Sequence, residues 1–210
     1  GLCLERGFEV LVLTNAYRAI DRYFDDLIEL NSKYPDKILL RVSLDHHTAD
    51  IHEQERGPKT FERTLHTTKK LVDNRFKVSI AGRSLANESV SDALLGYQST
   101  LTSYDINLNV ADGSNMVIFP EMSTSKDVPE ITTACWDILG VHPHQQMCAS
   151  ERMVVKRKGS DYPVVLPCTL IAYDEAFEMG KTLKESFHRV YLNHPYCAQF
   201  CVLGGASCSA

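Results

Sequence analysis

The residues of this chain that could do chemistry include five cysteines, all within residues 148–210. These cysteines are Cys148, Cys168, Cys197, Cys201 and Cys208. Thiolates bind soft metal ions and iron–sulfur clusters, and folding brings ligands from separate loops to one centre. We therefore predict a sulfur-ligated metal centre in the C-terminal part of the chain.

Three kinds of structure could use these cysteines, and the residues alone leave all three open. A disulfide framework is typical of small secreted domains, whereas five is an odd number and the rest of the chain looks like an ordinary intracellular enzyme. Structural zinc takes four ligands, usually with close CxxC pairs, and the closest pair here is the wider Cys197-x-x-x-Cys201. An iron–sulfur cluster takes four cysteines at irregular spacing, and we favour this interpretation.

The composition is that of a globular protein and argues against several other classes. The chain has 210 residues, of which 44% are hydrophobic and 23% charged, so it can bury a sizeable core. A formal net charge of −5 gives no general footprint for nucleic acid. No apolar run approaches the length of a membrane span, and no signal peptide is recognisable. We expect a cytoplasmic protein that binds neither nucleic acid nor membrane.

Strands and helices alternate through the first 120 residues. Strands are predicted at 8–14, 38–45, 76–81 and 116–120, with a further candidate at 106–110. Between the first two, Ile20, Phe24, Leu27 and Ile28 repeat with the period of an amphipathic helix. Such alternation predicts βαβ units and a parallel sheet.

Polar residues follow these strands where binding sites of parallel sheets collect, at the carboxyl ends. Several successive strand ends carrying polar groups predict one shared pocket. The main candidates are Ser43, Asp45, His46, His47, Arg83 and Glu121.

The alternation stops after Met122. A short helix is predicted at 127–139, with Cys135 on its inward face as a small core residue, and Cys3 is expected to be buried in the same way. We place the domain boundary near residues 123–130. The prediction is an α/β domain over 1–125, followed by a small cysteine-rich α+β domain over 126–210.

The strand series resembles the later half of a radical S-adenosylmethionine (radical SAM) barrel. The matching segments are Val10–Asn15, Arg41–Asp45 and the Arg56-Gly57-Pro58 step before a helix. The tail is similar to the SPASM/twitch extension of that superfamily. There, a cysteine precedes a β-hairpin, a second follows in a Pro-Cys step, and the others come after a short helix. Here Cys148, Gly159, Pro167-Cys168 and the three last cysteines stand at those places.

The resemblance implies a partial (β/α) radical SAM barrel with an auxiliary [4Fe-4S] cluster on the five tail cysteines. Ser43 and Arg83 match positions that contact the SAM ribose or carboxylate in related enzymes, Asp45 belongs to the same pocket, and Glu121 ends the strand that meets adenine. The family's CxxxCxxC loop and Gly-Gly-Glu motif occur nowhere in these 210 residues. We therefore expect a C-terminal fragment, inactive alone, whose full-length parent binds SAM and a second [4Fe-4S] cluster.

The implied reaction is reductive cleavage of SAM to a 5′-deoxyadenosyl radical that removes hydrogen from a peptide or small-metabolite substrate. An external electron donor such as flavodoxin or ferredoxin is implied as a partner. The alternative from another class is a non-catalytic zinc- or iron–sulfur-binding module on an α/β scaffold. No family role can be transferred to His46 and His47, which either line the substrate site or face solvent.

Overall fold

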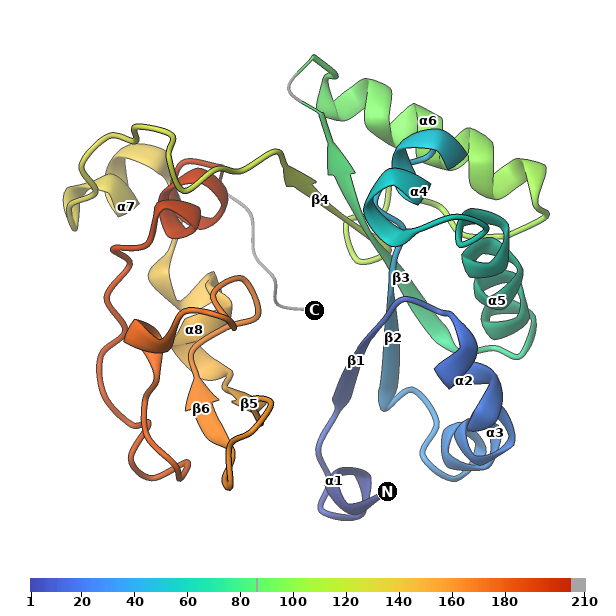
Figure 1. Cartoon of the computed structure of the whole chain (residues 1–210), viewed down its shortest axis with the longest axis horizontal. Coiled ribbons are helices and arrows are strands. Elements are labelled where there is room, and N and C mark those ends of the chain that lie inside the picture. Colours follow the sequence, from blue (N-terminus) through green and yellow to red (C-terminus); the bar gives the residue numbers. More distant parts are fainter. Residues whose placement is uncertain (86, 205–210) are drawn as a thin grey trace. The chain divides into compact units, whose positions relative to one another are not determined.

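The structure is a computed structural model that describes residues 1–85 and 87–204 (Figure 1). It divides into two compact units, Gly1–Glu121 and Met122–Ala210, and each is described here by itself. Cys208, a predicted cluster ligand, lies outside the described residues. No helix among the residues searched has both the length and the apolar character needed to cross a membrane.

The first unit contains a four-stranded parallel sheet in the order β1-β2-β3-β4. The predicted α/β class with parallel strands is confirmed, and within the described residues β1 and β4 are open edges, so no closed barrel is present. The segment 106–110 does not form the strand that its sequence suggested. Its residues instead pack as a turn-rich connection that places Ile106 and Val110 in the core. The strands are β1 (Val10–Thr14), β2 (Ile38–Ser43), β3 (Lys77–Ser84) and β4 (Met116–Pro120).

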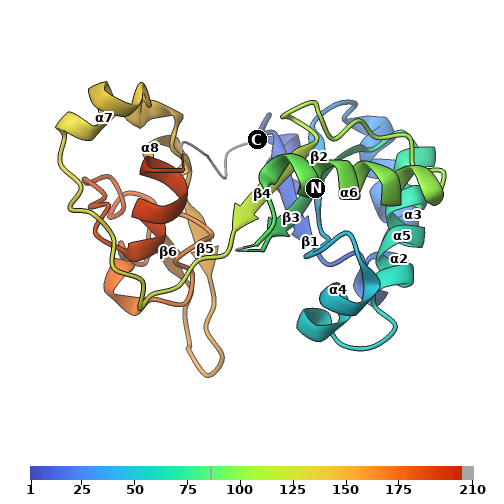
Figure 2. The ribbon, with the colours of Figure 1, turned by 90° about the horizontal axis from the view of Figure 1, so that it is seen from above.

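The helices of this unit connect each strand to the next. Helix α1 precedes β1, α2 and α3 connect β1 to β2, α4 and α5 connect β2 to β3, and α6 connects β3 to β4. Right-handed crossovers between neighbouring strands in sequential order place their helices on one face, and Figures 1 and 2 show α2–α6 on one side of the sheet. Their bounds are α1 (Leu2–Glu5), α2 (Arg18–Arg22), α3 (Phe24–Lys33), α4 (Ala49–Arg56), α5 (Phe61–Asp73) and α6 (Val90–Ser103).

One apolar core joins this face of the sheet to the helices. From β2 and β3 it takes Leu40 and Ile80, which are fully buried, and from α5 and α6 it takes Leu65 and Leu101. Because side chains alternate along a strand, Leu39, Arg41, Ser43, Ser79 and Arg83 belong to the opposite face. The sheet therefore has a packed helical face and a second face that carries polar groups.

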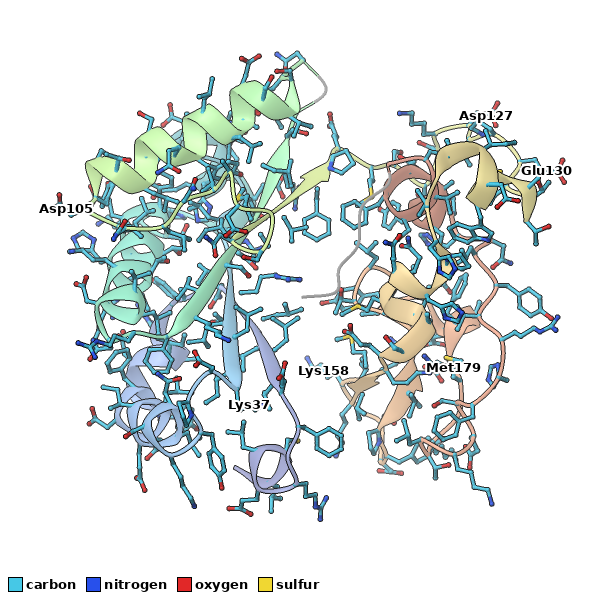
Figure 3. The ribbon with its side chains drawn as sticks, turned by 180° about the vertical axis from the view of Figure 1, so that it is seen from behind. Lys37, Asp105, Asp127, Glu130, Lys158 and Met179 are labelled. Atoms are coloured by element: carbon cyan, nitrogen blue, oxygen red, sulfur yellow. The ribbon has the colours of Figure 1, made fainter. Side chains whose placement is uncertain are left out.

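The second unit has little regular structure. Its antiparallel hairpin, β5 (Met153–Val155) with β6 (Val164–Leu166), brackets Gly159, whose φ of +84° suits a turn. Met179, labelled in Figure 3, is buried, and its N–H donates a hydrogen bond to the carbonyl of Val165 in β6 at 2.8 Å. The remaining elements are α7 (Ala134–Leu139), η1 (Pro143–Gln145), α8 (Met147–Ser150), η2 (Glu175–Phe177) and the π-helical turn η3 (Cys197–Val202).

Two expectations about minor cysteines are wrong. Cys3 is exposed, because the short helix α1 buries only Leu4. Helix α7 covers less than half of the predicted span 127–139 and buries none of its residues, so Cys135 is only partly covered. The apolar spacing that indicated an inward face belongs to a helix of six residues, with Ile138 78% exposed.

Candidate functional site

The carboxyl end of β2 places a buried carboxylate next to two arginines. Arg56, the last residue of α4, binds Asp45 through two guanidinium nitrogens, of which Nη2 lies 3.2 Å from Oδ1. Arg83 of β3 approaches the same carboxylate, with Nε 3.5 Å from Oδ1, and its Nη2 lies 3.5 Å from Glu55. This two-sided pairing compensates the buried negative charge and fixes the ends of two adjacent strands relative to α4.

His52 of α4 holds the backbone of the same residue. The N–H of Asp45 donates to His52 Nδ1 at 3.1 Å, so the proton of the neutral ring lies on Nε2. That nitrogen is buried without a hydrogen-bond partner among the described residues, and the ring lies edge-on to Phe61 at 5.6 Å. Burial is the main cause that lowers the pKa of His52 below its usual 6.5.

The stability of the protein should therefore depend on the state of His52. Because its folded pKa lies below the unfolded value of 6.5, the unfolded chain binds more protons between those two values, and stability falls as the pH drops below about 6.5. Asparagine keeps an acceptor for the N–H of Asp45 but cannot be protonated. Urea unfolding of wild type and His52→Asn between about pH 7.5 and 5 should show the wild type losing more stability. Equal slopes would contradict this assignment.

Tyr97 of α6 connects the same two strand ends from the helical face. Its fully buried hydroxyl donates to the carbonyl of Leu44 at 3.0 Å and accepts the N–H of Arg83 at 3.0 Å. Burial raises the pKa of Tyr97 above its normal range, so the phenol stays protonated. Gly82 leaves room for the ring, since a Cβ there would collide with it.

Beside this network, His46, His47 and Glu88 form a compact group. His47 Nε2 lies 2.8 Å from Glu88 Oε1, and His46 Nε2 lies 3.7 Å from Glu88 Oε2. The two imidazoles stack with 4.1 Å between ring centroids. Glu88 Oε2 is buried and makes no hydrogen bond among the described residues. His46 and His47 are thus ordered by the fold rather than solvated on a free loop.

The residues predicted to contact SAM occupy two of the strand ends and the segment after a third. Ser43 ends β2 on the face opposite the helices, and no side-chain hydrogen bond of Ser43 is found within the described part of the chain. Arg83 lies inside β3, which runs three residues beyond the predicted strand to Ser84. Glu121 follows β4 and is the last residue of the first unit. The ion pairs already described place Asp45 and Arg83 together.

Three of the predicted cluster ligands lie close enough in the second unit for their charges to act on one another, but among the described residues no cysteine belongs to a group of three possible metal ligands within 4.8 Å of one another. Burial raises the pKa of the Cys197 thiol to about 11, and the negative charges that Cys168 and Cys148 would carry add to this rise. Burial is the main cause that raises the pKa of the Cys148 thiol, and the negative charge that Cys168 would carry adds to this rise. Cys168 is partly buried, which raises the pKa of its thiol, and hydrogen bonds from the N–H groups of Leu170 and Ile171 partly offset this rise. Cys201 belongs to the same turn as Cys197, in η3.

A cavity of about 800 Å³ lies beside Cys148 and is formed entirely by the second unit. Cys148 and Trp136 line it, together with Glu130, which is labelled near α7 in Figure 3. Gln146 also lines it with a buried amide oxygen that has no hydrogen-bond partner among the described residues. The volume is typical of small-molecule sites.

Sequence reasoning missed Tyr97, His52 and Glu88. The helical period places Tyr97 on the buried face of α6, but a tyrosine there is indistinguishable from an ordinary core residue. Glu88 lies in a connection without periodicity, so its approach to His47 has no local signal. A scan against protein-family models finds no match for this chain, and a search of curated proteins finds none either.

Proposed function

We propose that this chain is the C-terminal portion of a radical SAM enzyme, with four strands of a (β/α) barrel followed by an auxiliary [4Fe-4S] domain. The observation that supports the proposal is that Cys148, Cys168 and Cys197, from three separate segments of the second unit, lie close enough for their charges to act on one another. Thiols from distant segments in one small unit are expected for a cluster site.

Among the described residues, the second unit has no close group of ligands of the kind that a single zinc ion needs. Tetrahedral zinc with Zn–S bonds of about 2.3 Å holds its sulfurs about 3.8 Å apart. Among the described residues, no group of three possible ligand atoms in the second unit lies within 4.8 Å of one another. In a four-iron cluster each cysteine binds a different iron, so the sulfurs are spaced more widely. The N–H groups at Cys168 match the hydrogen bonds that tune cluster thiolates.

The first unit fits the barrel part of the proposal. Its sequential strand order, with all crossover helices on one face, is the arrangement expected for four consecutive strands of a (β/α) barrel. The face opposite the helices would line the barrel interior, and it carries Ser43 and Arg83 at the ends where such enzymes bind ligands. Arg83, paired with Asp45 and Glu55 and partly exposed, would meet the SAM carboxylate with its guanidinium.

When bound and reduced by one electron, SAM supplies methionine and a 5′-deoxyadenosyl radical that removes a hydrogen atom from the substrate. An external flavodoxin- or ferredoxin-like donor would deliver the electron. The substrate, a peptide or small metabolite, would be held partly by the cavity beside Cys148. Gln146 is among its lining residues, and its side-chain amide would hydrogen-bond a peptide group.

The test uses a full-length protein in which a CxxxCxxC segment precedes this chain. After anaerobic reconstitution with iron and sulfide, addition of dithionite and SAM should give 5′-deoxyadenosine. Arg83→Ala should raise the KM for SAM, whereas His66→Ala, which changes an exposed side chain of α5, should not. A colourless protein with one tightly bound zinc would support the alternative, a non-catalytic zinc module on an α/β scaffold. Cluster-loaded protein that never cleaves SAM would also overturn the proposal.

A further inference from the structure

We propose that His46, His47 and Glu88 form a binding site for a divalent transition-metal ion, separate from the cysteines and independent of the SAM chemistry. The three side chains offer ligand atoms that all lie within 4.8 Å of one another. Two imidazoles and one carboxylate are a donor set that binds zinc and ferrous iron and leaves positions open for water or substrate.

The geometry is close to what such an ion needs. Metal–ligand bonds of about 2.1 Å in tetrahedral arrangement separate the ligand atoms by about 3.4 Å. The distance from His46 Nε2 to Glu88 Oε2 is 3.7 Å, and that from His47 Nε2 to Glu88 Oε1 is 2.8 Å. Shifts of less than about 1 Å in these two pairs would accommodate the ion.

The burial of the Glu88 carboxylate favours the binding of a cation at this site. Glu88 Oε2 is buried without a hydrogen-bond partner among the described residues, which is costly for a carboxylate oxygen unless a cation or donor meets it. The side chain of His46 is only 4% exposed, while those of His47 and Glu88 are 18% and 17% exposed. The site is therefore enclosed on the His46 side and open to solvent on the other.

The surrounding fold fixes the two rings. A Cβ on Gly96 of α6 would lie 2.6 Å from three atoms of the His47 ring, so only glycine admits the ring at this place. The edge of His47 also contacts Tyr97 at 5.5 Å between centroids, and Thr100 donates to the carbonyl of His47 at 2.8 Å. This support is what a preorganised ligand requires.

Metal binding would exchange one hydrogen bond of His46 for another in the turn before α4. His46 Nδ1 now accepts the N–H of Thr48 at 3.0 Å, and Thr48 Oγ1 lies 2.8 Å from the same nitrogen. When Nε2 binds an ion, the ring proton lies on Nδ1 and needs an acceptor, which Thr48 Oγ1 supplies. The N–H of Thr48 must then turn away, so its amide resonance should shift on metal binding.

The experiment is a titration of the full chain with Co²⁺, followed by equilibrium dialysis and absorption. Cobalt held by thiolates gives strong near-ultraviolet charge-transfer bands, whereas cobalt held by imidazole and carboxylate gives only weak visible bands. One equivalent of the second kind should bind. Glu88→Gln, His46→Ala and His47→Ala should each weaken it at least about 100-fold, since even an outer-shell partner contributes about 10–100-fold.

Three further variants separate ligation from folding. Thr48→Val should weaken cobalt binding about 10-fold or more with little loss of stability, while Thr48→Ser restores it. Gly96→Ala should weaken binding by displacing His47, and His66→Ala, an exposed histidine of the same unit, should have no effect. Binding that survives intact in Glu88→Gln or His47→Ala, or that shows thiolate bands alone, would overturn the proposal.

Discussion

Cys168→Ser protein, reconstituted anaerobically with iron and sulfide, should retain less than about one iron per chain, where the wild type retains about four. The charge that Cys168 would carry acts on both Cys148 and Cys197, so we choose this thiol for substitution. Serine has nearly the same size but supplies no thiolate, so the iron bound at this position should be held much more weakly and the cluster should be lost during desalting. Iron and sulfide analysis, with the brown absorption of the cluster, gives the measurement.

The matched controls are the two cysteines that are not predicted to be cluster ligands. Cys3→Ser changes an exposed residue of the first unit, and Cys135→Ser changes a partly covered residue of α7. Both proteins should bind iron as the wild type does. If Cys168→Ser retains a full cluster, or if Cys135→Ser loses it, the proposed ligand set is wrong.

Tyr97→Ala should destabilise the first unit by about 3–5 kcal/mol, the range for removal of a large buried aromatic side chain. Tyr97 is among the largest fully buried side chains of the protein. Tyr97→Phe should cost about 1–3 kcal/mol, because the carbonyl of Leu44 loses a buried donor. The phenylalanine variant thus isolates the hydroxyl from the packing of the ring.

The measurement should follow the first unit specifically. The three helices of ten or more residues, α3, α5 and α6, all belong to it, so far-ultraviolet circular dichroism in urea mainly reports its unfolding. Fluorescence of Trp136, the only tryptophan, reports on the second unit. Tyr104→Phe is the control, since no hydrogen bond of its hydroxyl is found within the described residues. Equal costs for Tyr97→Phe and Tyr104→Phe would show that the Tyr97 hydroxyl does not stabilise the strand ends.

The parallel sheet could be predicted because its signal is local. The apolar runs 8–14, 38–45 and 116–120 each contain a strand of the structure, and the intervening helical period is strong enough to define βαβ units. The two failures in this unit have a local cause as well. At 106–110 the apolar residues of an alternating pattern pack into the core, but the segment pairs with no strand. At Gly82 the glycine suggests a loop, whereas in the structure β3 continues through it and the missing side chain makes room for Tyr97.

The second unit was less predictable because its elements are short. Its hairpin around Gly159 follows from β-forming runs flanking a turn, and the structure contains it. The predicted helix at 127–139 and the short helix that the resemblance implies before Cys197 largely do not form, since a short segment adopts a helix only where packing supports it. The cysteine pattern indicates which thiols can act together, but their proximity depends on loops with no periodic signal.

By itself, the sequence determined which segments form the strands and which polar residues, including Asp45 and Arg83, lie at their ends. It also determined which cysteines are available as ligands. Tertiary structure alone decided which groups meet. Glu88 lies 41 residues from His47 in the chain, yet their atoms are 2.8 Å apart, and Tyr97 reaches Leu44 across 53 residues. Periodicity reports only the direction in which a side chain leaves its own helix or strand. Contacts between distant elements arise from the packing of the whole core, so they have no signature in any single segment.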